Sequence, residues 1–156
     1  MAKSGIDLVY GGGRAGLMGI LAEEVLQGEG EVLGVIPKHM VNREDAHYGL
    51  TELVEVETMH ERKAMMIDRA DAFVALPGGL GTLEEISEVL SWAQMRLHTK
   101  PIGLLNTAQF YQPFVSFFEH LVEAGFVSTE SRELLLVREE PTQLIEALET
   151  KIADDT

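Results

Sequence analysis

The segment from Pro77 to Glu85 restricts the fold more than any other part of the chain, because its glycines join a short apolar run to the start of a helix. The run before it, residues 72–76, is apolar and ends at a proline, which is typical of a buried strand. Apolar residues then recur at helical spacing, so we expect a helix over residues 83–97 with Thr82 as its N-cap. Glycines let a backbone approach a ligand closely, and the free N–H groups of a helix start attract anions. The segment therefore predicts a phosphate-binding strand–turn–helix unit.

The same alternation of strands and helices runs through the rest of the chain. We expect strands at residues 6–10, 32–36, 51–56, 72–76, 102–105 and 134–137, and helices at residues 17–27, 60–70, 83–97, 111–124 and 142–152. Strands that alternate with helices form a mostly parallel sheet with helices on both faces, so we expect an α/β, Rossmann-like, doubly wound fold. A length of 156 residues fits one domain, so we expect a single nucleotide-binding domain over residues 1–156.

The composition limits the classes of function. A net charge of −14 opposes binding to a nucleic-acid backbone, although a single nucleotide needs only a few local cations. The chain has no cysteine, which fits a reducing compartment, and no apolar run long enough for a membrane span or a signal peptide. Its five histidines show no metal-binding spacing. We therefore expect a cytoplasmic protein without a catalytic metal, a membrane anchor or a nucleic-acid partner.

A second glycine-rich turn follows the first expected strand. Residues 11–16, GGGRAG, match the dinucleotide-binding pattern G-x-G-x-x-G. That pattern also expects an acidic residue at the end of the next strand to bind a ribose, but Pro37, Lys38 and His39 follow that strand instead. Three interpretations stay open: a mononucleotide phosphate site, an NADP site in which Lys38 or His39 meets a 2′-phosphate, and a merely structural turn.

Two adjacent cations, Arg62 and Lys63, lie near the start of the helix expected over residues 60–70. They could belong to a solvated helix face. The helix dipole, however, disfavours cations in a first turn, and a bound anion would compensate for this. Arg62 would then supply a planar fork of donors and Lys63 a point charge.

Three motifs together resemble the LONELY GUY (LOG) family of cytokinin riboside 5′-monophosphate phosphoribohydrolases, many bacterial relatives of which are described as AMP nucleosidases. The motifs are YGGGxxGLMG at residues 10–19, MHERK at residues 59–63 and PGGLGTLEE at residues 77–85. The order and separation of the last two make the resemblance specific, and it extends to the C-terminus. Some relatives carry a lysine decarboxylase label, but no lysine here lies in a recognisable pyridoxal-phosphate context.

The resemblance implies that the chain is a hydrolase that cleaves the N-glycosidic bond of a nucleoside 5′-monophosphate, giving free base and ribose 5-phosphate. This reaction needs no metal or redox cofactor. Arg62 and Glu85 match the family's catalytic pair. A carboxylate such as Glu85 suits the positive charge that builds on the ribose as the C1′–N bond breaks. The substrate-binding positions are Glu44, Lys63, Gly78, Gly79, Leu80, Gly81, Thr82, Leu83, Glu84 and Ser91, to which we add Gly12 and Gly13 of the first glycine-rich turn.

The resemblance also bears on assembly and on the N-terminus. LOG relatives are commonly homodimers, and the helix over residues 83–97 has more apolar surface than one buried stripe requires. We therefore expect a homodimer with this helix in the contact. Family members usually begin with a further strand and helix before the motif at Tyr10. Since Met1 to Ile6 looks like the tail of such a helix, the chain is expected to lack the family's N-terminal βα unit of roughly 30 residues.

Two other functions stay open at this point. A non-catalytic nucleotide or cofactor carrier on the same scaffold would need the glycines but not Glu85. An NADP-binding protein is disfavoured by the missing ribose-binding acid and the lack of an obvious substrate domain. Adenine and an N6-prenylated adenine both remain open as the base.

Overall fold

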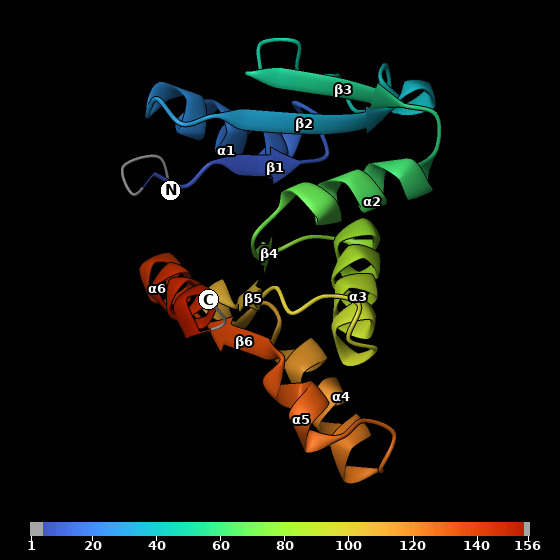
Figure 1. The fold of residues 1–156 in the computed structure, drawn as a ribbon, viewed down its shortest axis with the longest axis vertical. Coiled ribbons are helices and arrows are strands. Elements are labelled where there is room, and N and C mark those ends of the chain that lie inside the picture. Colours follow the sequence, from blue (N-terminus) through green and yellow to red (C-terminus); the bar gives the residue numbers. More distant parts are fainter. Residues whose placement is uncertain (1–4, 155–156) are drawn as a thin grey trace. The chain divides into compact units, whose positions relative to one another are not determined.

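The computed structural model describes residues 5–154, in which strands and helices alternate along the chain (Figure 1). The strands are β1 (Leu8–Tyr10), β2 (Val32–Pro37), β3 (Glu52–Val56), β4 (Phe73–Ala75), β5 (Ile102–Leu105) and β6 (Leu135–Arg138). The α-helices are α1 (Gly16–Gln27), α2 (Met59–Arg69), α3 (Leu80–Gln94), α4 (Gln112–Glu123), α5 (Thr129–Glu133) and α6 (Pro141–Asp154), and two short 3-10 helices are η2 (Lys38–Met40) and η3 (Thr107–Gln109). The chain divides into two compact units, Met1–Ala70 and Asp71–Thr156.

Every strand pairing in the described residues is parallel. The first unit contains a three-stranded sheet in the order β1-β2-β3, and the second a three-stranded sheet in the order β4-β5-β6. This confirms the predicted α/β, Rossmann-like class with parallel strands. The strands form two sheets of three, whereas the sequence suggested one. The expected helix tail at the start of the chain falls almost wholly on residues 1–4, outside the described part.

Helices cover both faces of the first sheet, because successive residues of a strand point to opposite sides. Leu8 and Tyr10 of β1 lie in one core cluster with Ala22 and Val25 of α1. Val9, between them, points to the other face and packs with a second cluster that includes two methionines of α2. The short strand β1 therefore contacts a helix on each side, as a doubly wound fold requires.

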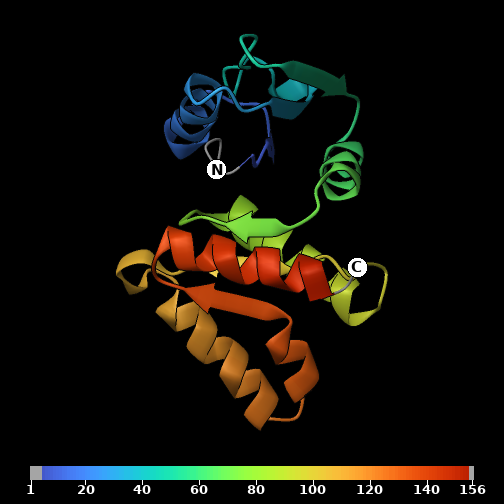
Figure 2. The same ribbon diagram turned by 60° about the vertical axis from the view of Figure 1, so that its left-hand side comes forward.

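Helix α6 covers one face of the second sheet, as Figure 2 shows. Leu105 of β5 forms a core cluster with Leu144 and Leu148 of α6. A Cβ atom at Gly103 would lie 2.9 Å from a methyl carbon of Leu144, so this glycine allows the helix to approach the sheet closely. Ile102 and Leu104 point to the opposite face and are also fully buried. Both faces of the second sheet are thus covered.

Charged side chains protect the β3 edge of the first sheet. Strand β3 is at the end of the sheet order, and its Glu52 and Glu55 are exposed. Charged side chains on an edge strand oppose pairing with a strand of another molecule.

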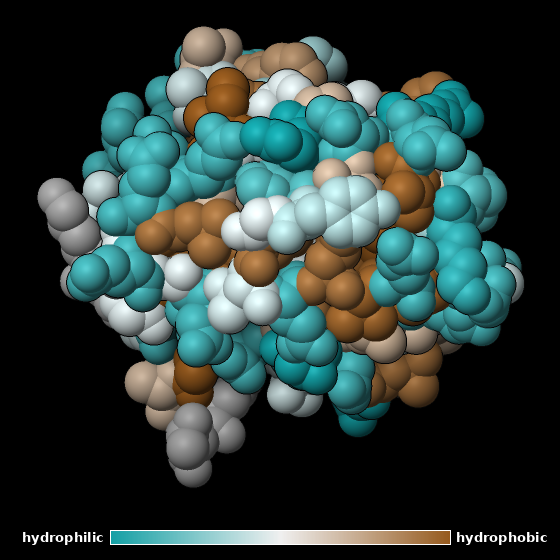
Figure 3. Space-filling model, turned by 90° about the horizontal axis from the view of Figure 1, so that it is seen from above, coloured by the Kyte–Doolittle hydropathy of each residue, from teal (hydrophilic) through white to brown (hydrophobic). Residues whose placement is uncertain are grey.

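On the face seen from above Figure 1, hydrophilic side chains predominate and hydrophobic atoms show between them (Figure 3). Among residues 5–154, no helix has the length and apolar character needed to cross a membrane.

The main departure from the sequence prediction is the start of α3. The helix begins at Leu80, three residues before the expected Leu83, and its N-cap is Gly79. The prediction that Thr82 caps this helix is therefore wrong, because Thr82 lies inside the first turn. Gly79 adopts an extended conformation and makes no side-chain cap, so the first N–H groups of α3 lie directly at the glycines. Helix α5, which begins after the N-cap Ser128, was not predicted.

Candidate functional site

A capping box fixes the start of the helix that carries the two cations. Thr58 is the N-cap of α2; its hydroxyl accepts a hydrogen bond from the Glu61 N–H at 3.1 Å, and the Glu61 carboxylate accepts one from the Thr58 N–H at 3.3 Å. These bonds satisfy donors that a helix start leaves unpaired. Arg62 and Lys63 follow at once and are only 5% and 8% exposed. They do not form a solvated helix face.

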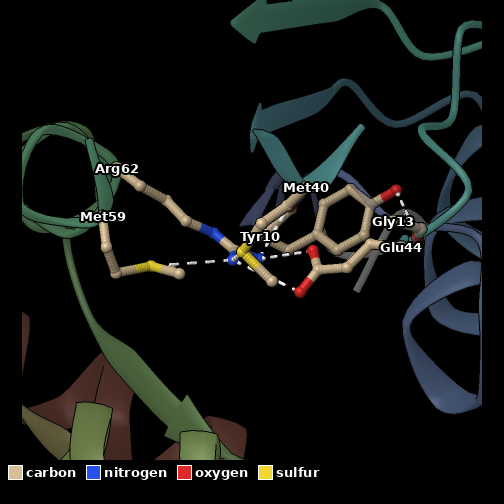
Figure 4. Close-up of polar contacts among 7 residues, drawn as sticks. Tyr10, Gly13, Met40, Glu44, Met59 and Arg62 are labelled. Atoms are coloured by element: carbon tan, nitrogen blue, oxygen red, sulfur yellow. Dashed lines mark hydrogen bonds and ion pairs between the residues drawn. The ribbon is translucent and has the colours of Figure 1, made fainter. Parts of the chain in front are cut away.

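The Arg62 guanidinium is held by a carboxylate and a backbone carbonyl (Figure 4). Its Nη2 donates to Glu44 Oε2 at 3.1 Å and to the Gly11 carbonyl oxygen at 3.0 Å, and its Nη1 donates to Glu44 Oε1 at 3.4 Å. This paired arrangement of two N–H groups on two oxygens is the geometry that arginine, but not lysine, can adopt. Glu44 therefore fixes the plane of the guanidinium.

Two methionine side chains provide further contacts to the Arg62 guanidinium. The sulfur atoms of Met40 and Met59 lie 3.9 and 3.8 Å from Nη1, and Figure 4 shows them close to the guanidinium. The Nε atom is buried and has no hydrogen-bond partner among the described residues. A buried donor without a partner is costly in a folded protein. Arg62 thus keeps one N–H group that a ligand could satisfy.

The first glycine-rich turn is tightly packed against these two residues. A Cβ atom at Gly11 would lie 1.8 Å from Arg62 Nη2, and one at Gly13 would lie 2.9 Å from the Glu44 carbonyl oxygen. Gly12 has a φ of +79°, which favours glycine over other residues. The close approach of Arg62 and Glu44 is therefore a structural reason for the glycines.

Tyr10 supports this turn from inside the core. Its hydroxyl donates a hydrogen bond to the Gly13 carbonyl oxygen at 3.1 Å, as Figure 4 shows. Burial raises the pKa of Tyr10 to about 12, with a smaller opposing effect from Arg14 and a reinforcing one from Glu23. The phenol therefore stays protonated at neutral pH and remains a donor.

The loop that carries Glu44 is tied to the glycine turn by its backbone. Gly13 and Ala46 form an isolated antiparallel bridge, and the His47 N–H donates to the Gly12 carbonyl oxygen at 2.9 Å. The sequence placed Glu44 in a polar connection but gave no sign of this pairing, because a single bridge has no periodic pattern. The bridge explains how a residue 18 positions before Arg62 reaches its guanidinium.

In the second unit, the turn between β4 and α3 leaves open space beside two of its glycines. A Cβ atom at Gly78 would lie 2.2 Å from the Thr82 hydroxyl oxygen, so that glycine is needed for packing. A Cβ atom at Gly79 or Gly81 would have no neighbour within 4 Å. The turn follows the carboxyl end of β4, which is where ligands bind in parallel α/β sheets.

Tyr111 and Asn106, which sequence reasoning missed, support this second turn. The Tyr111 hydroxyl donates to the Leu76 carbonyl oxygen at 2.5 Å, and the Asn106 side-chain oxygen accepts from the Tyr111 N–H at 2.7 Å. Burial raises the pKa of Tyr111, and the backbone of Gly78 acts in the opposite sense. The only sequence signal was an asparagine directly after an apolar strand, which is typical of a local side-chain-to-backbone bond.

Glu84 and Glu85 lie in the second turn of α3, where Glu84 is exposed and Glu85 is half-buried. Ser91 is exposed on the same face of α3 as Glu84, but about 10 Å further along the helix.

The structure therefore joins Gly12, Gly13, Glu44 and Arg62 in one cluster, with Lys63 buried on the same helix as Arg62. It places the residues from Gly78 to Glu85 around a second turn, and Ser91 apart from that turn.

No set of three or more His, Asp or Glu side chains close enough to hold a metal ion occurs within residues 5–154.

The chain is similar in sequence to a set of curated enzymes. A family described as possible lysine decarboxylase matches residues 18–148. A cytokinin riboside 5′-monophosphate phosphoribohydrolase from Arabidopsis thaliana is 46% identical over 149 residues, which cover 96% of this chain and 70% of the relative. One from Rhodococcoides fascians is 49% identical over 138 residues, which cover 88% of this chain and 70% of the relative. A probable cytokinin riboside 5′-monophosphate phosphoribohydrolase from Oryza sativa subsp. japonica is 49% identical over 144 residues, which cover 92% of this chain and 59% of the relative. The chain thus spans between 59% and 70% of these relatives' own lengths.

Proposed function

Since the chain belongs to the LONELY GUY (LOG) family of phosphoribohydrolases, we propose that it hydrolyses the N-glycosidic bond of a nucleoside 5′-monophosphate. The reaction breaks the C1′–N bond, attaches the oxygen of water to C1′ and leaves one proton of that water on the departing base. The products are the free base and ribose 5-phosphate. The proposed substrate is AMP or its N6-prenylated cytokinin counterpart, so the chain would act as an AMP nucleosidase or as a cytokinin-forming enzyme.

The open glycines of the turn between β4 and α3 carry this proposal. Gly79 has a φ of −97°, which other residues adopt without strain. Gly81 lies inside a helix, where glycine costs about 1 kcal/mol relative to alanine. Because neither residue is required by the backbone or by packing within its unit, room for a ligand is a physical reason for both. We assign Gly78, Gly79, Leu80, Gly81, Thr82 and Leu83 to the 5′-phosphate, which the N–H groups at the start of α3 would bind.

Glu85 is the proposed catalytic carboxylate. As the C1′–N bond breaks, positive charge develops on the ribose ring, and a carboxylate nearby stabilises it and can orient or deprotonate water. A phosphate site alone has no use for a negative side chain at this position. Glu84, which is more exposed, is assigned to substrate binding.

Arg62 is the second proposed catalytic residue, and Glu44 orients it. The guanidinium would stabilise negative charge on the phosphate or on the departing base, and its buried Nε donor has no partner among residues 5–154. Lys63, on the same helix, adds a second positive charge. Gly12 and Gly13 border this cluster and Ser91 lies on α3, and all three are assigned to substrate binding.

We propose that the active form is a cytoplasmic homodimer. Helix α3 leaves less apolar surface for a subunit contact than the sequence suggested. Four of its apolar residues are already buried within its own chain, namely Ile86, Val89, Leu90 and Ala93. Leu80 and Met95 remain 86% and 58% exposed at its two ends and would lie in the contact. Light scattering at low micromolar concentration tests this, and an active monomer would contradict it.

The test of the activity is to incubate the protein with AMP or isopentenyladenosine monophosphate and to separate the released bases by chromatography. We expect base and ribose 5-phosphate in equal amounts. Adenosine serves as a control, and it should react poorly because it lacks the 5′-phosphate. Binding of AMP without release of base would instead indicate a nucleotide carrier.

A further inference from the structure

A cavity of about 750 Å³ lies in the second unit, away from the glycine-rich turn. Its lining includes Pro101 and Ile102 at the amino end of β5, and Leu134 and Leu136 around the amino end of β6. Since the strands of this sheet are parallel, the amino ends lie at the edge opposite the turn that follows β4. The cavity is therefore separate from the residues assigned to the nucleotide phosphate.

Positive charge is concentrated in this cavity. Residues 71–156 contain five lysines and arginines, of which Arg96, Lys100 and Lys151 line the cavity. The same residues contain fourteen aspartates and glutamates, of which only Glu130 and Glu133 line it. Figure 2 shows the end of α6, which carries Lys151, near the segment that follows α3. A local excess of cations in a chain of net charge −14 attracts an anion.

Arg96 occupies a backbone position that favours glycine. It follows the end of α3 with a φ of +59°, and its N–H donates to the Ala93 carbonyl oxygen at 2.9 Å. Helices commonly place glycine at such a position, because a side chain there is strained. Neither Arg96 nor Lys151 makes an ion pair within the described residues. A strained arginine without an internal carboxylate partner is explained if its charge serves a ligand.

Other polar groups of the cavity suit an organic phosphate. Thr99 belongs to the lining, as do Ser128 and Ser131, whose hydroxyl groups are hydrogen-bonded to each other at 3.0 Å. His98 Nε2 lies 3.0 Å from the Val89 carbonyl oxygen, to which it donates, so Nδ1 is an acceptor whenever the ring carries a single proton. That Nδ1 atom is buried and lacks a hydrogen-bond partner in residues 5–154. It could accept a hydrogen bond from an N–H or O–H group of the ligand.

We propose that this cavity is a second ligand site, which binds a small organic phosphate through Arg96, Lys100 and Lys151. The volume is that of a site for a drug-sized molecule and exceeds what a bare phosphate ion fills. Ala93, Ile102 and Leu134 give the lining an apolar portion for the organic part. The ligand class is a phosphorylated metabolite that carries a hydrogen-bond donor, such as a nucleoside polyphosphate.

The experiment is isothermal titration of the full chain with ATP, with pyrophosphate as the bare-anion comparison. We expect ATP to bind at least about tenfold more tightly than pyrophosphate, because only ATP reaches His98 and the apolar lining. Saturating AMP, added to the Glu85→Gln variant so that it is not hydrolysed, should leave the ATP affinity unchanged. Competition by AMP, or equal affinity for ATP and pyrophosphate, would overturn the assignment of this cavity to an organic phosphate.

Arg96→Gly is the most informative variant, because it removes a charge while relieving backbone strain. We expect a higher melting temperature together with an affinity for ATP that is about tenfold lower. The double variant Arg96→Glu/Lys151→Glu should lose detectable binding. Arg138→Glu is the matched control, since Arg138 is an exposed cation of the same unit outside the cavity. Unchanged ATP binding in Arg96→Gly, or an equal loss in Arg138→Glu, would refute the site, whichever outcome the hydrolysis assay gives.

Discussion

Arg62 shows how the neighbours of one residue define what it can do. A buried guanidinium needs compensation, and here it comes from the Glu44 carboxylate at 3.1 Å and the Gly11 carbonyl oxygen at 3.0 Å. The pair fixes the plane of the guanidinium before any substrate arrives. A group that is already oriented loses little freedom during the reaction, which is how preorganised charges favour a transition state. Glu44, assigned from sequence to the substrate, therefore also has a structural role as the partner of Arg62.

We expect Arg62→Lys to behave nearly as badly as Arg62→Ala in base release, with kcat/KM at least about a hundredfold lower, because a lysine cannot pair with both Glu44 oxygens. Arg62→Ala should also lower the free energy of unfolding by about 3 kcal/mol, since it leaves a mostly buried carboxylate unpaired. Arg69→Lys on the same helix is the control. Arg69 forms an ion pair with Glu52 in which both side chains are 54% exposed, so the pair contributes little. Normal kinetics for Arg62→Lys would reduce Arg62 to a generic positive charge.

Tyr10 gives a pH dependence that can be measured. Its pKa is raised by burial to about 12 in the folded protein, against about 10 in the unfolded chain. The unfolded state therefore loses the proton first, so this stabilisation is complete below pH 10 and is lost as the pH rises through 12. Urea unfolding at pH 8 and pH 11 should show a steeper loss of stability for the wild type than for Tyr10→Phe. Parallel losses would contradict the assigned pKa.

At the scale of helices and strands, much of the fold could be predicted from the sequence. Runs such as β5 and the amphipathic helix α6 carry their own periodic signal, and both were predicted within a few residues. Two features were missed for different reasons. Thr82 fits the N-cap preference, but the extended Gly79 before it allows the helix to start earlier. The bridge that brings Glu44 to Arg62 is a tertiary contact and has no sequence signal.

The two helix starts give a direct stability test. Thr58→Ala should lower the free energy of unfolding by about 1 kcal/mol, because it removes the capping box of α2. Thr82→Ala should lower it by less than about 0.5 kcal/mol, since the Thr82 side chain caps nothing. Urea denaturation of both variants measures the difference. A larger loss in Thr82→Ala would show that the helix begins where the sequence pattern suggested.

At the scale of the whole molecule, the two units repeat one design. Each is a parallel three-stranded sheet, and each has a glycine-rich turn directly after a strand, at Gly11 and at Gly78. The net charge of −14 acts against binding to a nucleic-acid backbone, whereas a small anion needs only a few local cations. The sequence predicted the turns from their glycines. It missed the residues that hold them, such as Tyr111, because these come from distant parts of the chain.

The central claim is that Glu85 stabilises the transition state of N-glycosidic cleavage, and Glu85→Gln tests it most directly. The measurement pairs the rate of adenine release from AMP with the dissociation constant for AMP, with Glu84→Gln as the matched neighbour. We predict that Glu85→Gln abolishes release while AMP binding stays within about tenfold, because the lost charge acts mainly in the transition state. Glu84→Gln should be milder. Full activity in Glu85→Gln, or a greater loss in Glu84→Gln, would contradict the account.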